Sequence, residues 1–284
     1  MSVNGRFLLE LVLLAGFSQT VWSQSQPSAA EIIRRSVATN TADWKAQLLY
    51  AHREADTKST IDATNRATVH SSKTYDVMMI EGSPYNRLIA INNEPLGAKQ
   101  AQQEERKFHA EIQKRHSESP TEREKRLSAF RSERSEEHLL MEQMAKAFLF
   151  KLVGEEKLGN LDCYVLDAAP DPNYTPPVQK ARVLSGMKGK MWIEKTQFHW
   201  AKVQAEVIHP VEFALFVAKV KPGTSFELQQ SPVGSVWLPC QFIENVNASV
   251  LGVYSMRSRE QERYFDYRPN GFTKDKANLS SIRD

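Results

Sequence analysis

Apolar positions three and four residues apart open the patterned part of the chain. Ser28, followed by a Glu three positions later, has the form of a capping box, and Ile33 and Val37 lie one helical turn apart behind it. This pattern predicts a helix over residues 28–41. From Trp44 the apolar period changes to two, which predicts a strand.

Alternating or continuous apolar runs, separated by short turns, fill much of the remaining chain. Gly82 opens a Gly-Ser-Pro turn between two such runs, so a hairpin is expected there. The predicted strands cover residues 73–81, 85–91, 157–168, 188–195, 199–209, 213–220, 225–230, 236–246 and 263–267. Regular strands with short connections favour an antiparallel sheet that curls or closes. The predicted fold class is therefore α+β, with a curved antiparallel sheet covered by helices.

A charged segment, residues 94–150, interrupts the strands. Acidic and basic side chains at three- and four-residue spacing predict two solvated helices, the second beginning at Pro120. A third, amphipathic helix follows and carries Leu140, Met144 and Phe148 on one face. The segment is either a solvated spacer or an arm that docks a partner protein. Its balanced charges argue against binding to nucleic acid or to an anionic membrane.

The first 23 residues have the form of a secretion signal. Arg6 precedes an apolar stretch over residues 7–22, and Val21 and Ser23, at positions −3 and −1 of the expected cleavage site after Ser23, are β-branched and small. A membrane anchor is less favoured, because the run is short for a bilayer and contains Glu10. We expect a single exported domain, residues 24–284, in the periplasm or outside the cell.

Two cysteines remain in the predicted mature chain. Hydrophobic residues make up 41% of the sequence, enough for a packed core. In an oxidising compartment Cys163 and Cys240 could form a disulfide, and the alternative is two free thiols in separate strands. The sequence leaves both states open.

The sequence contains no recognisable catalytic or metal-binding pattern. The seven histidines lack the helical spacing with an intervening Glu that zinc sites use. No Gly-x-Ser-x-Gly turn, phosphate-binding loop, dinucleotide fingerprint or Cys-x-x-Cys pair is found. We therefore expect a protein that is not an enzyme, with no cofactor and no metal, and an enzymatic function is the least favoured hypothesis.

Large apolar side chains gather in the C-terminal strands. They form either an ordinary core or a cavity that accepts an acyl chain beneath a movable helical cover. The candidate cavity residues are Trp192, Ile193, Val203, Phe213, Phe216 and Phe242. The candidate cover residues are Leu140, Met144 and Phe148.

The order of the predicted elements and one hairpin resemble a known superfamily. Residues 189–203 read Gly-Lys-Met-Trp-Ile-Glu-Lys-Thr-Gln-Phe-His-Trp-Ala-Lys-Val. With the N-terminal helix and the long meander, this hairpin resembles the bacterial lipoprotein-sorting superfamily of LolA and LolB carriers and RseB-type sensors, with Glu194 where Asp is usual. The resemblance implies a half-open β-barrel of about eleven strands with helices over its mouth. It also implies binding of a lipid or an acylated protein in the periplasm.

Two hypotheses for function follow. The first is a periplasmic binding protein for a lipid, an acyl chain or a lipoprotein. The second is an envelope sensing or interaction module whose charged helices dock a membrane protein. Neither involves nucleic acid.

Overall fold

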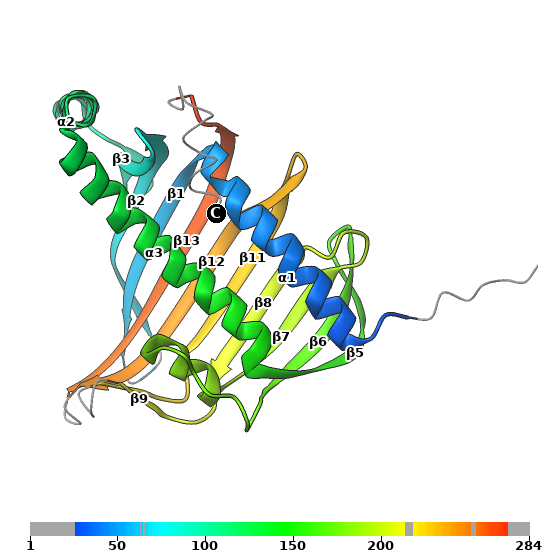
Figure 1. The fold of residues 1–284 in the computed structure, drawn as a ribbon. Coiled ribbons are helices and arrows are strands. Elements are labelled where there is room, and N and C mark those ends of the chain that lie inside the picture. The colour runs from blue at the N-terminus through cyan, green and yellow to red at the C-terminus, as the bar shows by residue number, and fades with distance from the viewer. Residues whose placement is uncertain (1–25, 63, 65, 214–217, 251–253, 272–284) are drawn as a thin grey trace, which may run out of the picture.

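One open antiparallel sheet organises the chain. The computed structural model describes residues 26–62, 64, 66–213, 218–250 and 254–271. Thirteen strands form the sheet, with eleven in the order β4-β3-β2-β1-β13-β12-β11-β8-β7-β6-β5, while β10 pairs with β12 and with β9. The path ends at β4 on one side and at β5 on the other, so the sheet stays open (Figure 1). The predicted α+β class with a curved antiparallel sheet is confirmed.

The strands are mostly long. Their bounds are β1 Tyr50–Ile61, β2 Ala67–Ile80, β3 Ser83–Ile91, β4 Glu94–Pro95, β5 Phe148–Leu158, β6 Leu161–Pro170, β7 Met187–Glu194, β8 Trp200–Val207, β9 Val211–Phe213, β10 Ala218–Val220, β11 Ser225–Val233, β12 Val236–Val250 and β13 Tyr254–Pro269. The hairpin expected at Gly82 joins β2 to β3, and Gly82 has a φ of 85°, a backbone conformation that glycine adopts without strain.

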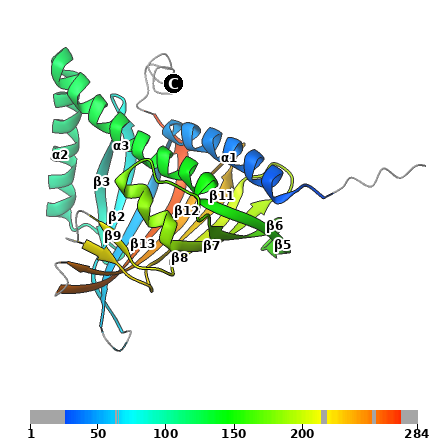
Figure 2. The ribbon, with the colours of Figure 1, turned by 60° about the horizontal axis from the view of Figure 1, so that its bottom comes forward.

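Three α-helices accompany the sheet. They are α1 (Ala29–Ala46), α2 (Ala98–His116) and α3 (Pro120–Ala147), and two 3-10 turns, η1 (Gln47–Leu49) and η2 (Gln179–Gly186), follow α1 and precede β7. α1 and α3 lie side by side across one face of the sheet (Figure 1), and α2 stands at the β3 end (Figure 2). We call the face beneath α1 and α3 the covered face, and the other one the outer face.

Helix starts were predictable, but helix ends were not. The Ser28 hydroxyl accepts a hydrogen bond from the Glu31 backbone N–H at 3.2 Å, and Ser119 forms a capping box at the start of α3. However, α1 continues five residues beyond 41, so Trp44 is helical. The second charged helix and the amphipathic helix are one element, α3, because no glycine or proline interrupts the chain after Pro120.

Two further segments differ from their predictions. Phe148 has extended backbone angles and opens β5, so its assignment to the cover helix is wrong. The expected strand over 213–220 is wrong as well, because Val211–Phe213 and Ala218–Val220 pair antiparallel with each other. The predicted signal sequence, residues 1–23, lies outside the described residues.

A buried hydrogen bond between Asp43 and His199 ties the end of α1 to the sheet. The His199 Nδ1 lies 2.6 Å from the Asp43 Oδ2, and the Trp237 backbone N–H donates to the Asp43 Oδ1 at 3.1 Å. The His199 ring stacks on the Trp237 ring with centroids 5.0 Å apart. Burial raises the pKa of the Asp43 carboxyl, against the hydrogen bonds from Trp237 and His199. These contacts join α1 to the strands that begin at Trp200 and Val236.

Two arginines fasten the α2–α3 hairpin to the turn between β2 and β3. The buried Arg115 guanidinium donates to the carbonyl oxygens of Ile80, Ser83 and Pro84 at 2.9, 2.8 and 3.1 Å. Arg126 donates to the Ser83 hydroxyl at 2.7 Å. Charge-assisted hydrogen bonds from two guanidinium groups therefore hold the hairpin to this turn.

We expect Arg115→Met to loosen this hairpin while leaving the rest of the fold intact. The variant keeps much of the apolar stem but removes the charge-assisted hydrogen bonds to the carbonyl oxygens of Ile80, Ser83 and Pro84, which should cost about 2–4 kcal/mol of local stability. Hydrogen exchange of the α2 amides should accelerate, with exchange in β6–β8 unchanged. Arg106→Met, at an exposed position of α2, is the matched control. Equal α2 protection in both variants would contradict the fastening role.

Candidate functional site

The apolar contact between the helices and the sheet is the first candidate site. We call it the seam: the contact of α1 and α3 with strands β5 to β8 and β11. Its helix side is formed by Ile32, Ile33, Val37, Met141 and Met144. Its sheet side is formed by Phe150, Leu152, Tyr164, Leu166, Met191, Ile193, Val203, Phe226 and Leu228. The seam therefore contains most of the apolar residues on the covered face.

A row of small residues crosses the sheet beneath the seam. Ala168, Gly189 and Ala205 are aligned across β6, β7 and β8. A Cβ atom at position 189 would lie 2.7 Å from the Gln204 carbonyl oxygen, so only glycine fits at this position of the row. Above the row lies a cavity of ≈ 20 Å³, which has room for about one water molecule. In this state the seam is closed.

Several predicted cavity residues lie in the seam. Ile193 is fully buried and Val203 is 4% exposed, both packed in the core of the covered face. Met144 borders the cavity above the row, and Leu140 packs beside the same cluster. Phe148 also borders this cavity, although it does so from β5 rather than from the helix. The predicted cover thus consists mainly of α3, together with α1.

The other predicted cavity residues lie elsewhere. Trp192 points to the outer face, where its Nε1 donates to the Glu156 carboxylate at 2.8 Å. Phe242 shares the covered face with the seam, and its ring lies 6.5 Å from the Phe226 ring. Phe216 and the Phe213 side chain lie outside the described part of the chain.

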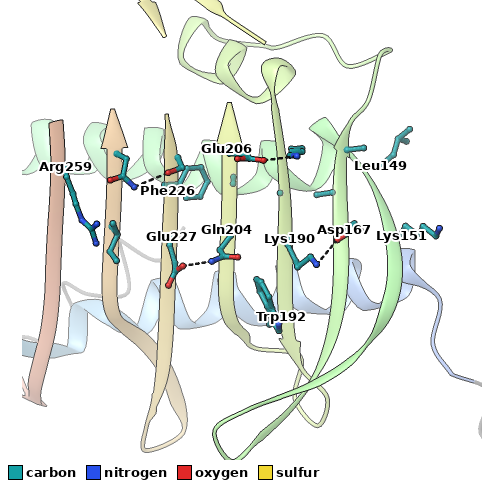
Figure 3. Close-up of a pocket in the computed structure, with 18 residues that line it drawn as sticks. Leu149, Lys151, Asp167, Lys190, Trp192, Gln204, Glu206, Phe226, Glu227 and Arg259 are labelled. Atoms are coloured by element: carbon teal, nitrogen blue, oxygen red, sulfur yellow. Dashed lines mark hydrogen bonds and ion pairs between the residues drawn. The ribbon is translucent and has the colours of Figure 1, made fainter. Parts of the chain in front are cut away.

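The outer face carries a second candidate site, an open hollow of ≈ 940 Å³. We call it the outer hollow. Figure 3 shows its side chains on the face opposite the helices. Strands β5 to β8 and β11 to β13 line it with Leu149, Lys151, Asp167, Ala168, Ala169, Lys188, Gly189, Lys190, Trp192, Gln204, Ala205, Glu206, Ser225, Phe226, Glu227, Ile243, Asn245 and Arg259. The volume is within the range of small-molecule sites, and the lining combines charged side chains with apolar surface.

Carboxylates gather on the covered face beyond the seam, where β1, β12 and β13 adjoin. This acidic band consists of Glu54, Asp56, Glu244, Glu260 and Glu262. The band lies on the covered face because residues paired on neighbouring strands point to the same side of a sheet. Phe242 pairs with the seam residue Leu228 on β11 and with Glu262 of the band on β13. Burial, followed by the charge of Glu54, raises the pKa of Asp56 to about 7. Burial likewise raises the pKa values of Glu244 and Glu262.

Sequence reasoning missed the acidic band and the contact between Asp43 and His199. A signal for the band exists, since Glu54 and Asp56, like Glu260 and Glu262, alternate along their strands. The contact between Asp43 and His199 gives a weaker signal. Asp43 follows Ser36 and Asn40 at helical spacing on the buried side of α1, but nothing in the sequence indicates which strand it meets.

The remaining predictions concern thiols, metals and membranes. Both cysteines are free thiols, one of the two states that the sequence left open, and Cys163 is buried in β6 while Cys240 is in β12. Burial raises the pKa of the Cys163 thiol to about 11, so it is protonated at neutral pH. Within the described ranges no three His, Cys, Asp or Glu side chains are grouped as metal ligands. No described helix is long and apolar enough to cross a bilayer.

Comparison with known proteins gives only distant structural similarity. No protein-family profile matches the sequence, and no curated protein matches it. The chain is similar to a LolA superfamily protein from Nitrosomonas europaea, with 8% identity and a TM-score of 0.30 over 86% of this chain and 94% of that one. It is similar to a DUF1329 family protein from Desulfovibrio piger, with 9% identity and a TM-score of 0.32 over 89% and 100%.

A third similar structure is a domain assigned to outer membrane lipoprotein sorting from Vibrio parahaemolyticus. The identity is 10% and the TM-score 0.35, over 88% of this chain and 98% of that one. These structures include the superfamily that the hairpin motif indicated.

The acidic band should make stability depend on pH in an unusual direction. The pKa of Asp56 in the folded state lies above the unfolded value of about 3.9, so folding takes up a proton between the two values. Stability therefore rises as pH falls from about 7 towards 4. Between pH 8 and pH 5.5 we expect Asp56 to contribute a gain of about 1–2 kcal/mol, allowing for solvent screening.

Urea unfolding of the wild type and of Asp56→Asn at both pH values measures this contribution. The difference in unfolding free energy between the two proteins should shrink by that amount at the lower pH. Asp266→Asn, on the same strand pair but exposed, is the control. A constant difference at the two pH values would show that Asp56 is ionised normally in the folded protein.

Proposed function

We propose that this chain is a non-enzymatic binding protein, exported to the periplasm, that takes up the acyl chain of a lipid or lipoprotein between α3 and the sheet. The observation that carries the proposal is the row of Ala168, Gly189 and Ala205 beneath the seam cavity. Three aligned small residues on a covered sheet face leave a gap in a core that larger side chains would otherwise fill. An acyl chain lying along this row would extend a gap that is already present.

Methionines on both sides of the gap support an adaptable site. Met144 approaches it from α3, and Met187 and Met191 line it from β7. An unbranched methionine side chain has several rotatable bonds and fills irregular space, so it can move aside for a ligand at low cost. The same residues close the seam when no ligand is bound.

Besides its apolar contacts in the seam, the C-terminal half of α3 makes polar contacts that water can replace. The Tyr174 hydroxyl donates to the Gln143 side chain at 3.0 Å, and Lys180 forms an exposed ion pair with Glu136. Such contacts contribute about 1 kcal/mol each. Burial of an acyl chain gains about 0.8 kcal/mol per methylene, or about 10 kcal/mol for a myristoyl chain. This gain would offset the lost polar contacts, and the methylenes would replace the apolar contacts that α3 gives up.

The buried pair of His199 and Asp43 supports a binding role rather than catalysis. The His199 Nδ1 faces Asp43, and the Nε2 lies 3.0 Å from the Gln197 Oε1. With both ring nitrogens engaged, the imidazole has no position from which to activate a nucleophile. The pair therefore serves to hold α1.

Native mass spectrometry tests the proposal with matched substitutions on one strand. The chain from residue 24 onward, purified without detergent, should bind one myristate per molecule. Ala205→Leu fills the gap in the seam and should weaken binding at least about tenfold, because the added methyl groups occupy the ligand position. Ala201→Leu is the control, since Ala201 is equally buried but belongs to the outer cluster around Trp192.

Thermal unfolding of both variants separates a lost site from a lost fold. Equal loss of myristate binding in two variants of equal stability would contradict the seam as the site. Absence of any myristate complex in the wild type, with the fold intact, would overturn the proposal itself.

A second candidate function is docking of an envelope membrane protein through the α2–α3 hairpin. The four-way hydrogen bonding of Arg115 favours it, since a hairpin that served only as a spacer needs no rigid attachment. Reversing the exposed charges Lys99 and Arg106 should abolish crosslinking to one defined envelope protein in cells while leaving myristate binding unchanged. Unchanged crosslinks would exclude this surface of α2.

A further inference from the structure

The outer hollow has more cationic than anionic groups free to meet a ligand. Asp167 and Glu206 each pair with a lysine on the neighbouring strand β7. The Asp167 carboxylate lies 3.5 Å from the Lys190 Nζ, and the Glu206 carboxylate lies 2.8 Å from the Lys188 Nζ. These pairs neutralise the carboxylates in place.

Glu227 is the third carboxylate and is engaged as well. The Lys202 Nζ lies 3.1 Å from its carboxylate, and the amides of Gln204 and Gln229 donate to it at 2.6 Å each. Burial alone would raise the pKa of Glu227, but these three donors lower it, so the carboxylate stays ionised and balances Lys202. No carboxylate of the hollow is left to repel an anion.

Two cations of the hollow have no acidic partner among the residues the structure describes. Lys151 lies on β5 and Arg259 on β13, the two outermost strands of the lining, and Figure 3 shows them at opposite ends. Six strand-to-strand steps separate them, about 29 Å measured along the sheet. Only an elongated ligand can reach both.

The floor between the two cations suits hydroxyl groups better than peptide backbone. Every strand in the floor from β6 to β13 is paired on both sides, so no backbone edge is available for an added peptide strand. Recognition must use side chains instead. Gln204 donates to Glu227, and Asn245 donates to the Ser225 hydroxyl at 3.1 Å. Each of these amides has a second N–H and a carbonyl oxygen, so the floor offers both donors and acceptors.

We propose that the outer hollow binds an acidic oligosaccharide in an extended conformation, with its anionic groups paired to Lys151 and Arg259 and its hydroxyls on the floor. The charged side chains of this site point away from the seam, although the small-residue row of Ala168, Gly189 and Ala205 borders both cavities. The protein would then hold an acyl chain on one face and an anionic sugar chain on the other.

Isothermal titration with a linear galacturonate oligomer tests this proposal in the same chain, residue 24 onward. We expect saturable binding that weakens with added salt, because the contacts are ionic. The double variant Lys151→Gln with Arg259→Gln should weaken binding at least about tenfold. Exposed side chains at these positions contribute little to stability, so the fold should be retained.

The matched control is Lys99→Gln with Arg106→Gln, which removes the same charges from exposed positions of α2. Equal loss in both double variants would show that net charge alone attracts the sugar and would overturn the site. No binding of the galacturonate at millimolar concentration would overturn it as well. Equal binding of linear polyphosphate would contradict recognition of sugar hydroxyls, and no binding of a neutral maltose oligomer is expected.

Discussion

The position of the helical cover depends on the buried contact between Asp43 and His199. A wide sheet that is open at both ends must cover one apolar face with something else, and here α1 and α3 do so. Apolar contacts are not directional, so by themselves they do not fix the position of a helix along a sheet. The hydrogen bonds that join the Asp43 carboxyl to His199 and to the Trp237 N–H fix this position, and leaving a buried polar group unpaired typically costs about 1–3 kcal/mol. α3 then packs against a helix that cannot slide.

The two faces of the same strands carry different chemistry because side chains alternate. On β7, Met191 faces the seam while Lys190 faces the outer hollow, and on β8 Val203 and Gln204 divide in the same way. The sheet thereby separates the apolar seam beneath the helices from the open, charge-bearing hollow on the outer face. The two proposed ligands follow from this separation.

Local signals allowed much of the fold to be predicted. The N-cap residues Ser28 and Ser119, the glycine turn at 82 and the period-two runs place most elements, since each depends on neighbours in sequence. Longer-range contacts decided the rest. Phe148 continues a helical pattern but pairs with Pro170 on β6, and Asp43 finds His199 156 residues away. Ile193 and Val203 were correctly expected to face the helices, but Trp192, the neighbour of Ile193, lies on the outer face, and the closed seam and the outer hollow depend on packing.

The central claim is that α3 moves away from the sheet when an acyl chain binds. Pulsed electron resonance between nitroxide labels at Ser135 on α3 and Lys188 on the outer face, both exposed, measures this movement directly. The account predicts a single distance without ligand and a longer one when myristate is added. An unchanged distance in a sample that contains bound myristate would contradict the account, because the seam as it stands has room for only about one water molecule.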